Sequence, residues 1–212
     1  MMAENEFIDH YIRMSEEVFR PIYPYLSESV CKRARIETGA MKVIDLGGGS
    51  GLWLEAMLDK GAASGTVIDA SEKMTAYSLE RISGKYAPPK FSAKTGSADK
   101  IPLPDSSHNV IISRSSMHMW NNLEQCWQEM RRVLEDGGIA FLGRGYGPDL
   151  PESVKEQVKA ARKKMRSENP LDAKEEPPSP DPFALAQMAM KVGFNEVSLI
   201  KADKVVWILA RK

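Results

Sequence analysis

The fold of this chain is decided by the stretch Val43-Ile44-Asp45-Leu46-Gly47-Gly48-Gly49-Ser50-Gly51. A short apolar run ends there in an acid, glycines follow at alternate positions, and an apolar, helix-forming segment continues from Leu52 to Leu58. The pattern predicts a buried strand, a tight turn and the start of a helix. Glycine allows positive φ and lets a ligand reach the main chain without a Cβ in the way, and the first helical amides add unpaired donors. We therefore expect a ligand loop, although a tight turn without a ligand would have the same glycines.

Length and composition limit the class of protein. The 212 residues suit one domain with a modest insertion, and the 42% hydrophobic content supports a real core. Lysine plus arginine equals aspartate plus glutamate at 29 each, whereas nucleic-acid binders are usually strongly basic. Cys31 and Cys126 are too few for a disulfide framework or a zinc site, and no segment reads as a membrane span or a signal peptide. We expect a cytoplasmic protein with no metal, no membrane span and no nucleic-acid partner.

Strand and helix patterns alternate from Met41 onward. The expected strands are Met41–Leu46, Gly65–Asp69, Lys90–Thr95, Asn109–Ser113 and Ile139–Leu142. The expected helices are Leu52–Lys60 and Glu72–Ser83, the second with Ser71 as its N-cap. A third helix is expected from Asn121 or Asn122 to the Asp136-Gly137-Gly138 turn. Such alternation predicts parallel strands with helices on both faces and a ligand site outside the carboxyl ends of the strands. That rim would gather Gly47–Gly51, Asp69, Ser97–Asp99 and Ser113–His118.

The flanking segments complete a single α/β domain over residues 1–212. Residues 1–40 predict a helical cap, with one helix ending near Arg20-Pro21 and another running from Ser27 towards Ile36. Residues 143–180 predict an insertion or lid that holds a helix over Pro151–Glu168 and a proline-rich connector over Leu171–Pro182. Residues 181–212 predict a helix and an antiparallel strand pair, Phe194–Ile200 and Val205–Ala210. The result is a doubly wound, mostly parallel sheet of seven strands with an antiparallel C-terminal strand.

Four motifs over about Met41 to Leu142 resemble the class I S-adenosylmethionine-dependent methyltransferases, especially the small-molecule group of ubiquinone/menaquinone type. They are the glycine stretch, Val67-Ile68-Asp69-Ala70-Ser71-Glu72-Lys73-Met74, Gly96-Ser97-Ala98-Asp99-Lys100-Ile101-Pro102-Leu103-Pro104-Asp105, and Met130-Arg131-Arg132-Val133-Leu134-Glu135-Asp136-Gly137-Gly138. Departures from the family pattern are Gly48 for a cysteine or serine, Asp136 for a proline, and His108-Asn109 for Phe-Asp. The resemblance implies a Rossmann-like sheet and S-adenosyl-L-methionine as cofactor.

The resemblance also implies which residues bind the cofactor. Asp69 would accept hydrogen bonds from both ribose hydroxyls, Asp99 would accept from the adenine amino group, and Met74 would pack on the adenine plane. Asp45 would lie towards the cofactor's amino group. The remaining expected cofactor residues are Tyr11, Gly47, Gly49, Gly51, Ala70, Ser71, Ser97, Ala98, Ser113 and Arg114.

Two other ligand classes share part of this pattern. Asp69 would suit the ribose of a nicotinamide cofactor equally well, but Leu52 stands where a dinucleotide fingerprint needs its third glycine or alanine. No Gly-Lys-Ser/Thr follows the glycines, so the loop is no phosphate-binding P-loop. A non-catalytic S-adenosyl-ligand sensor or partner subunit stays open as the alternative to an enzyme.

The methyl acceptor is less defined. The chain has no Asn/Asp-Pro-Pro-Tyr/Phe element after the fourth strand and no Pro-Cys pair, so elimination favours a small-molecule acceptor. His118 is the candidate general base, and a structural or cofactor-side contact is its alternative. Tyr11, Arg144 and Tyr146 are candidates for the acceptor pocket, although Tyr11 could instead pack on the cofactor or in the core. The basic helix Lys155–Arg166 could attract an anionic substrate, but a solvated lid face is the favoured interpretation. The oligomeric state is left open.

Overall fold

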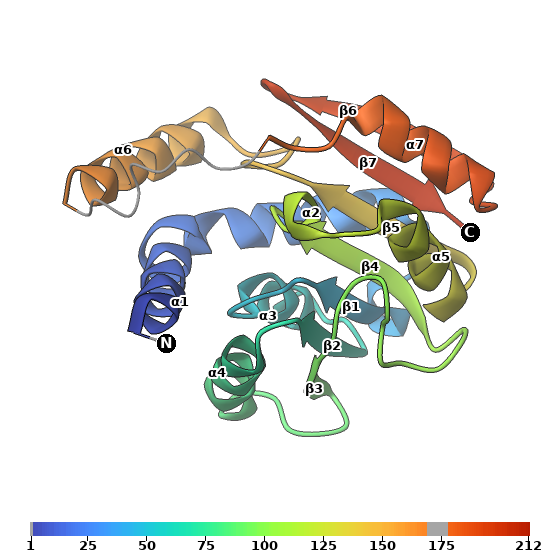
Figure 1. Ribbon diagram of the computed structural model, residues 1–212, viewed down its shortest axis with the longest axis horizontal. Helices are drawn as coiled ribbons and strands as arrows, with labels where there is room; N and C mark the ends of the chain where they lie inside the picture. The colour runs from blue at the N-terminus through green and yellow to red at the C-terminus, as the bar shows by residue number, and fades with distance from the viewer. Residues whose placement is uncertain (1, 169–177) are drawn as a thin grey trace.

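A mixed sheet of seven strands organises the computed structural model, which describes residues 2–168 and 178–212 (Figure 1). The strand order is β3-β2-β1-β4-β5-β7-β6. The strands are β1 (Lys42–Leu46), β2 (Ser64–Asp69), β3 (Phe91–Thr95), β4 (His108–Arg114), β5 (Leu134–Gly143), β6 (Glu196–Ala202) and β7 (Val205–Arg211). Strands β1 to β5 pair in parallel, and β7 pairs antiparallel with both β5 and β6. This confirms the doubly wound, Rossmann-like sheet with an antiparallel C-terminal strand.

Helices cover both faces of the sheet. The α-helices are α1 (Met2–Met14), α2 (Tyr23–Ala34), α3 (Leu52–Asp59), α4 (Glu72–Ser83), α5 (Leu123–Val133), α6 (Glu152–Glu168) and α7 (Pro182–Lys191). Shorter turns are the π-helical η1 (Ser15–Phe19) and the 3-10 segments η2 (Arg20–Ile22), η3 (Thr38–Ala40) and η4 (Met117–Met119). Helices α2, α3 and α4 contribute to the core on one face, and α5 and α7 to the core on the other. Helix α6 packs on η1 and η2, so the predicted insertion meets the N-terminal cap.

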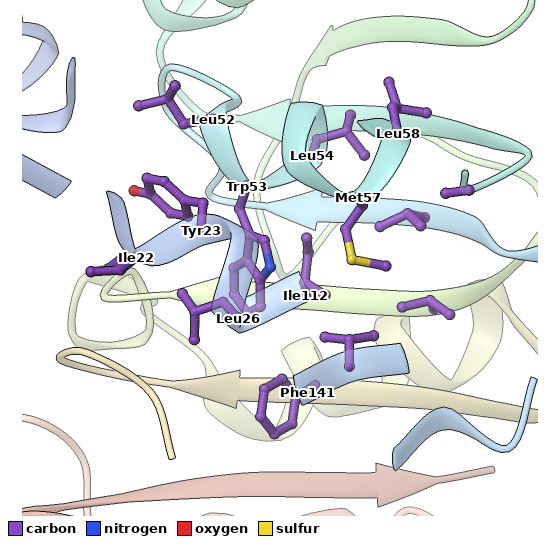
Figure 2. Packing of buried hydrophobic residues seen from close by; sticks show 14 of the residues in the cluster. Ile22, Tyr23, Leu26, Leu52, Trp53, Leu54, Met57, Leu58, Ile112 and Phe141 are labelled. Carbon is purple, nitrogen blue, oxygen red and sulfur yellow. The ribbon is translucent and has the colours of Figure 1, made fainter. Parts of the chain in front are cut away.

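The larger core contains three aromatic side chains in mutual contact, of which Figure 2 labels Trp53 and Phe141. Trp53 of α3 meets Phe141 of β5 and Trp207 of β7 edge to face, with ring centroids 6.3 and 5.9 Å away. Phe141 and Trp207 stack at 4.9 Å. All three are fully buried, and truncating a side chain of this size to alanine typically costs about 3–5 kcal/mol. This packing fixes α3, and with it the loop that precedes α3, against the middle of the sheet.

Several element boundaries differ from the sequence predictions. Helix α2 begins at Tyr23 rather than at Ser27, because Pro24 stands in its first turn, where a missing N–H costs nothing. Helix α5 ends at Val133, and Asp136-Gly137-Gly138 lies within β5 instead of closing the helix. Residues 171–177 of the predicted connector lie outside the described residues. The division of the chain into cap, core, lid and C-terminal part stays a prediction.

Neither a membrane-spanning helix nor a metal-binding cluster is found in the described ranges, 2–168 and 178–212. None of the helices there is both long and apolar enough to cross a bilayer. No group of three or more histidine, cysteine, aspartate or glutamate side chains in those ranges could hold a metal ion.

Candidate cofactor and acceptor site

The glycine loop connects the carboxyl end of β1 to α3. The amides of Gly47 and Gly48 donate to the Ile68 carbonyl of β2, at 2.7 and 3.2 Å, which fixes the loop to the neighbouring strand. Gly47 has φ +66° and Gly49 has φ +52°. A Cβ on Gly47 would lie 2.6 Å from the Ser116 Cβ, and one on Gly49 would lie 2.9 Å from the Tyr11 ring. Only glycine fits both the backbone conformation and the crowding, so the loop presents bare main chain.

Asp69 joins this loop to the start of α4. Its Oδ2 accepts from the Gly49 amide and its Oδ1 accepts from the Ser71 amide, each at 2.9 Å. The Ser71 hydroxyl caps α4 by accepting from the Met74 amide. Burial raises the pKa of Asp69, and the two amides oppose that rise because they stabilise the anion. Each carboxylate oxygen keeps a further acceptor site towards the cavity, which two ribose hydroxyls would suit.

One cavity of about 1280 Å³ extends along the carboxyl rim of the sheet. The predicted site residues that line it are Tyr11, Gly47, Gly49, Asp69, Ala70, Ser71, Met74, Ser97, Ala98, Asp99, Arg114, His118, Arg144 and Tyr146. Pockets for a single small ligand usually measure about 300–1,000 Å³. The space is therefore sufficient for a cofactor and an acceptor together.

Three predicted site residues lie behind the cavity wall instead. Asp45 is 3% exposed beneath the loop, where its Oδ2 accepts from the Leu54 amide at 3.3 Å. The Ser113 hydroxyl donates to the Leu46 carbonyl at 2.6 Å and also meets the Ser116 hydroxyl. Gly51 lies against the side chains of α4 and β2. In this structure these residues support the loop from below, and direct contact between them and a cofactor stays a prediction.

Asp45 is the most perturbed acid of the site. Its pKa is raised to about 7, mainly by burial and in smaller part by the nearby Asp69 carboxyl, while the Leu54 amide at the start of α3 opposes the rise. Asp45 is therefore partly protonated near neutral pH, beneath the glycine loop.

The predicted adenine end of the cavity is small and mostly apolar. Met74 and Ala98 are both buried, and the Ser97 hydroxyl donates to the Asp99 carboxylate. Cys126 of α5 also lines this end, a residue that the sequence interpretation left out. Burial raises the pKa of its thiol to about 12, so the thiol is a neutral wall and no nucleophile.

Arg114 stands where the cap, β4 and the loop after β5 meet. Its Nε donates to the Gly145 carbonyl at 2.9 Å and its Nη1 donates to the Tyr23 hydroxyl at 3.3 Å. The guanidinium carbon lies 4.2 Å from the centroid of the Phe19 ring, a cation–π distance. Tyr11 is partly buried nearby, and burial raises the pKa of its phenol, which stays neutral. His118 lies on η4, at the same rim.

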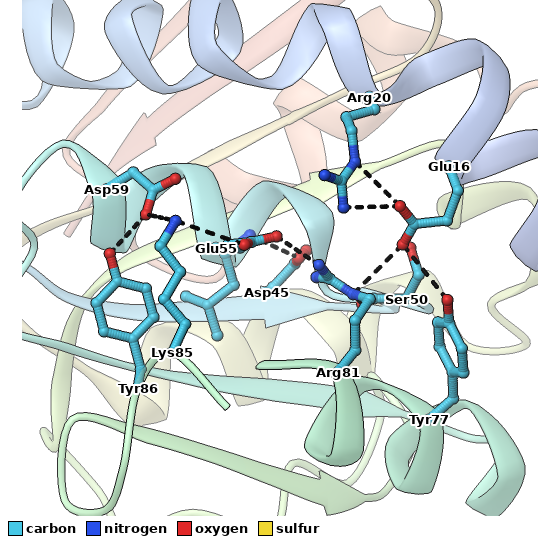
Figure 3. A network of polar contacts seen from close by, with 11 residues as sticks. Glu16, Arg20, Asp45, Ser50, Glu55, Asp59, Tyr77, Arg81, Lys85 and Tyr86 are labelled. Atoms are coloured by element: carbon cyan, nitrogen blue, oxygen red, sulfur yellow. Dashed lines mark hydrogen bonds and ion pairs between the residues drawn. The ribbon is translucent and has the colours of Figure 1, made fainter. Parts of the chain in front are cut away.

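A polar network fastens the cap to the glycine loop (Figure 3). Arg81 of α4 donates through Nε to the Ser50 carbonyl at 3.0 Å and forms ion pairs with Glu55 of α3 and Glu16 of η1. The Tyr77 hydroxyl donates to Glu16 at 3.4 Å. Because Arg81 and Glu16 are mostly buried, their attraction is less screened than that of a surface pair. The loop and the segment above it therefore form one unit.

The sequence interpretation missed part of the opposite wall, which comes from the β6–β7 turn and α6. Lys201 to Val205 line the cavity although they belong to the last hairpin. The sequence could have predicted this placement. In a hairpin whose second strand, β7, is antiparallel to β5, the first strand, β6, runs in the same direction as the parallel strands. Its carboxyl end therefore lies at the ligand rim.

The chain is similar in sequence to known methyltransferases. Residues 44–142 match the model of a methyltransferase domain. A malonyl-[acyl-carrier protein] O-methyltransferase of Nitrosospira multiformis is 25% identical over 76% of this chain and 62% of its own length. A demethylmenaquinone methyltransferase of Chlorobaculum parvum is 30% identical over 48% of this chain and 39% of its own length. The chain thus spans less than two thirds of either relative.

The fold is also similar to that of a solved structure. A crystal structure from Methanococcus maripaludis, assigned as an S-adenosyl-L-methionine-dependent methyltransferase, superposes with a TM-score of 0.77 at 24% identity, covering 97% of this chain and 91% of that one. Residues 44–142 therefore resemble a methyltransferase domain, and the fold, the glycine loop and the rim residues agree with that match. A bare glycine loop beside Asp69 fits S-adenosyl-L-methionine, the cofactor for which that Methanococcus structure is named.

Proposed function

We propose that this protein transfers the methyl group of S-adenosylmethionine to a small-molecule acceptor held in the same cavity. The observation that carries the proposal is the continuity of that cavity. It runs from the glycine loop and Asp69 to a separate wall made by the cap, α6 and the β6–β7 turn. A protein that only bound the cofactor would need the first half alone.

The roles of the side chains follow from their positions. The cofactor supplies an electrophilic sulfonium methyl, so the protein has to hold and align the reactants and exclude water. Asp69 and the loop amides would hold the ribose and the amino-acid part, and Asp99 with Met74 would hold the adenine. Tyr11 and Arg114 would close the site from the cap side. His118 is proposed as a general base for an acceptor that must lose a proton.

The relatives support a small acceptor without identifying one. One is named for a malonyl-acyl-carrier-protein oxygen and another for demethylmenaquinone, so related domains serve unlike acceptors. The neutral overall charge of the chain supports an acceptor other than nucleic acid. The two free cysteines, Cys31 and Cys126, are consistent with our proposal of a cytoplasmic location.

The test separates binding from transfer. Calorimetric titration with S-adenosylmethionine, S-adenosylhomocysteine and NADH should show binding of the first two ligands and none of NADH. Incubation with methyl-labelled cofactor and cell metabolites should then transfer label to a small molecule. NADH binding without a response to either S-adenosyl ligand would contradict the cofactor assignment, and tight S-adenosyl binding without label transfer would contradict an enzyme.

A further inference from the structure

The charges that line the cavity are divided between its two ends. The cofactor end carries Asp69 and Asp99. The other end carries Glu152 and Asp203 but also the cations Arg144, Lys155, Arg162, Arg166, Lys201 and Lys204. Among the described lining residues, bases outnumber acids at this end, whereas the chain as a whole has equal numbers of acids and bases.

Helix α6 directs only some of its basic residues into the cavity. Lys155, Arg162 and Arg166 are separated by seven and four residues, which places them on one face of the helix. That face lies beside the buried Val158 and Met165. The helix's other bases, Lys159, Lys163 and Lys164, are exposed and do not line the cavity. A solvated face thus describes the second set, whereas the first set is part of the cavity wall.

Among the described residues, the two acids that line this end share one partner. Lys155 forms ion pairs with both Asp203, at 3.1 Å, and Glu152, at 3.4 Å, so one lysine already engages both carboxylates. Within residues 2–168 and 178–212, Lys201 and Lys204 have no hydrogen bond or ion pair of their side chains. The β6–β7 turn therefore adds positive charge to a wall that is already basic.

Two guanidinium groups lie over the same aromatic ring, and all three side chains line the cavity. The guanidinium carbon of Arg114 lies 4.2 Å from the Phe19 centroid and that of Arg162 lies 5.8 Å from it. Both arginine side chains are partly buried. The planar guanidinium matches the oxygens of phosphate and carboxylate, so an anion between α6 and the β6–β7 turn would find a suitable partner in this wall.

From this arrangement we propose that the methyl acceptor carries an anionic group, a phosphate or a carboxylate, which binds between the Lys155-Arg162-Arg166 face of α6 and the β6–β7 turn. The proposal rests on the proposed function for the methyl transfer itself. Fixing one end of the acceptor there would leave its other end directed along the cavity towards the glycine loop. The same field would concentrate anionic molecules at the opening.

Matched pairs of probes test the charge requirement. The full chain, with S-adenosylhomocysteine and without it, is titrated with phenyl phosphate against phenol and with benzoate against benzyl alcohol. We expect at least one anion to bind more than about tenfold tighter than its neutral partner, with the preference falling as NaCl rises from about 50 to about 500 mM, because salt screens such contacts. Equal affinity within both pairs, including failure of all four probes to bind, overturns the proposal.

Variants locate the anion on the proposed face. Arg166→Gln changes an exposed residue and should leave folding intact, and Arg162→Gln removes the cation above Phe19. Each should weaken anion binding by about three- to tenfold. Lys163→Gln, an equal loss of charge on the outer face of the same helix, should change it by less than about twofold. Equal losses in Lys163→Gln and Arg166→Gln would overturn the location.

The same titrations keep this proposal separate from the proposed function. Binding of S-adenosylmethionine is measured for every variant and should stay within about twofold in Arg166→Gln and Lys163→Gln, because both residues lie on α6, away from the glycine loop. If the wild type fails to bind S-adenosylmethionine, the methyltransferase proposal fails while the probe pairs still decide on the anion site. If it binds S-adenosylmethionine but shows no anion preference, only the present proposal fails.

Discussion

Replacing Asp69 by asparagine tests the cofactor end of the cavity. In the native protein both carboxylate oxygens accept from main-chain amides, Gly49 on one side and Ser71 on the other, at 2.9 Å each. Asparagine keeps one acceptor and turns an NH₂ group towards the other amide, so one of the two bonds is lost. A hydrogen bond to a charged group contributes about 1.5–3 kcal/mol. We therefore expect the free energy of unfolding to fall by about that amount.

We expect the affinity for the cofactor to fall by more than the loss of folding stability accounts for. The substitution also removes acceptor sites that face the cavity, so the dissociation constant for S-adenosylmethionine should rise by more than about tenfold, or about 1.4 kcal/mol. Calorimetric titration measures binding, and denaturant unfolding of the same samples measures stability. Asp59→Asn is the control, because Asp59 is bonded to Lys85 and Tyr86 on the surface, away from the cavity. Unchanged cofactor affinity in Asp69→Asn, or an equal loss in Asp59→Asn, would refute the reasoning.

Four further substitutions address the loop, its support, the cap and the base. Gly49→Ala places a Cβ 2.9 Å from the Tyr11 ring at φ +52° and should cost about 1–3 kcal/mol in denaturant unfolding, with weaker cofactor binding; wild-type values would contradict the crowding. The pKa of Asp45 is raised to about 7, so the folded state binds a proton that the unfolded state releases from about pH 4 upward. The stability of the wild type relative to Asp45→Asn should therefore fall between about pH 4 and about pH 7, and a flat difference would show that Asp45 ionises normally. Arg81→Met removes the bonds to Ser50, Glu55 and Glu16, and hydrogen exchange over Ser15–Ile22 should accelerate, whereas Arg13→Met, which breaks an exposed pair, should leave it unchanged. His118→Ala should lower turnover while cofactor affinity stays within about threefold; equal loss of both would make His118 a cofactor contact.

The sequence predicted the parallel half of the sheet well because its signals are local. Buried strands of β-branched residues, an N-cap at Ser71 and glycines after β1 each act within a few residues of their own position. Asp69 and Asp99 could be placed on one rim because parallel strands end on the same side. Their lining of a common cavity follows from that topology.

The opposite wall could not be predicted from local signals. The pattern of α6 shows a basic helix, but whether Arg162 or Lys163 faces the cavity depends on how α6 packs on η1 and η2. The depth of Asp45 is a similar case, because its burial beneath the loop follows from how α3 turns over β1. Long-range packing decides both, and a single sequence does not encode it in any short window.

The position of β7 between β5 and β6 has a consequence for the order in which the cavity is built. The chain is synthesised from its N-terminus, and a domain generally folds as a unit. The loop, Asp69 and the start of α4 are all made before residue 75, and they pair with one another directly. Strand β6 reaches the sheet only through β7, so the positions of Lys201 and Lys204 depend on the pairing of β7 with β5. During synthesis the residues of the nucleoside half are therefore made first, and the basic half needs the last strands of the chain.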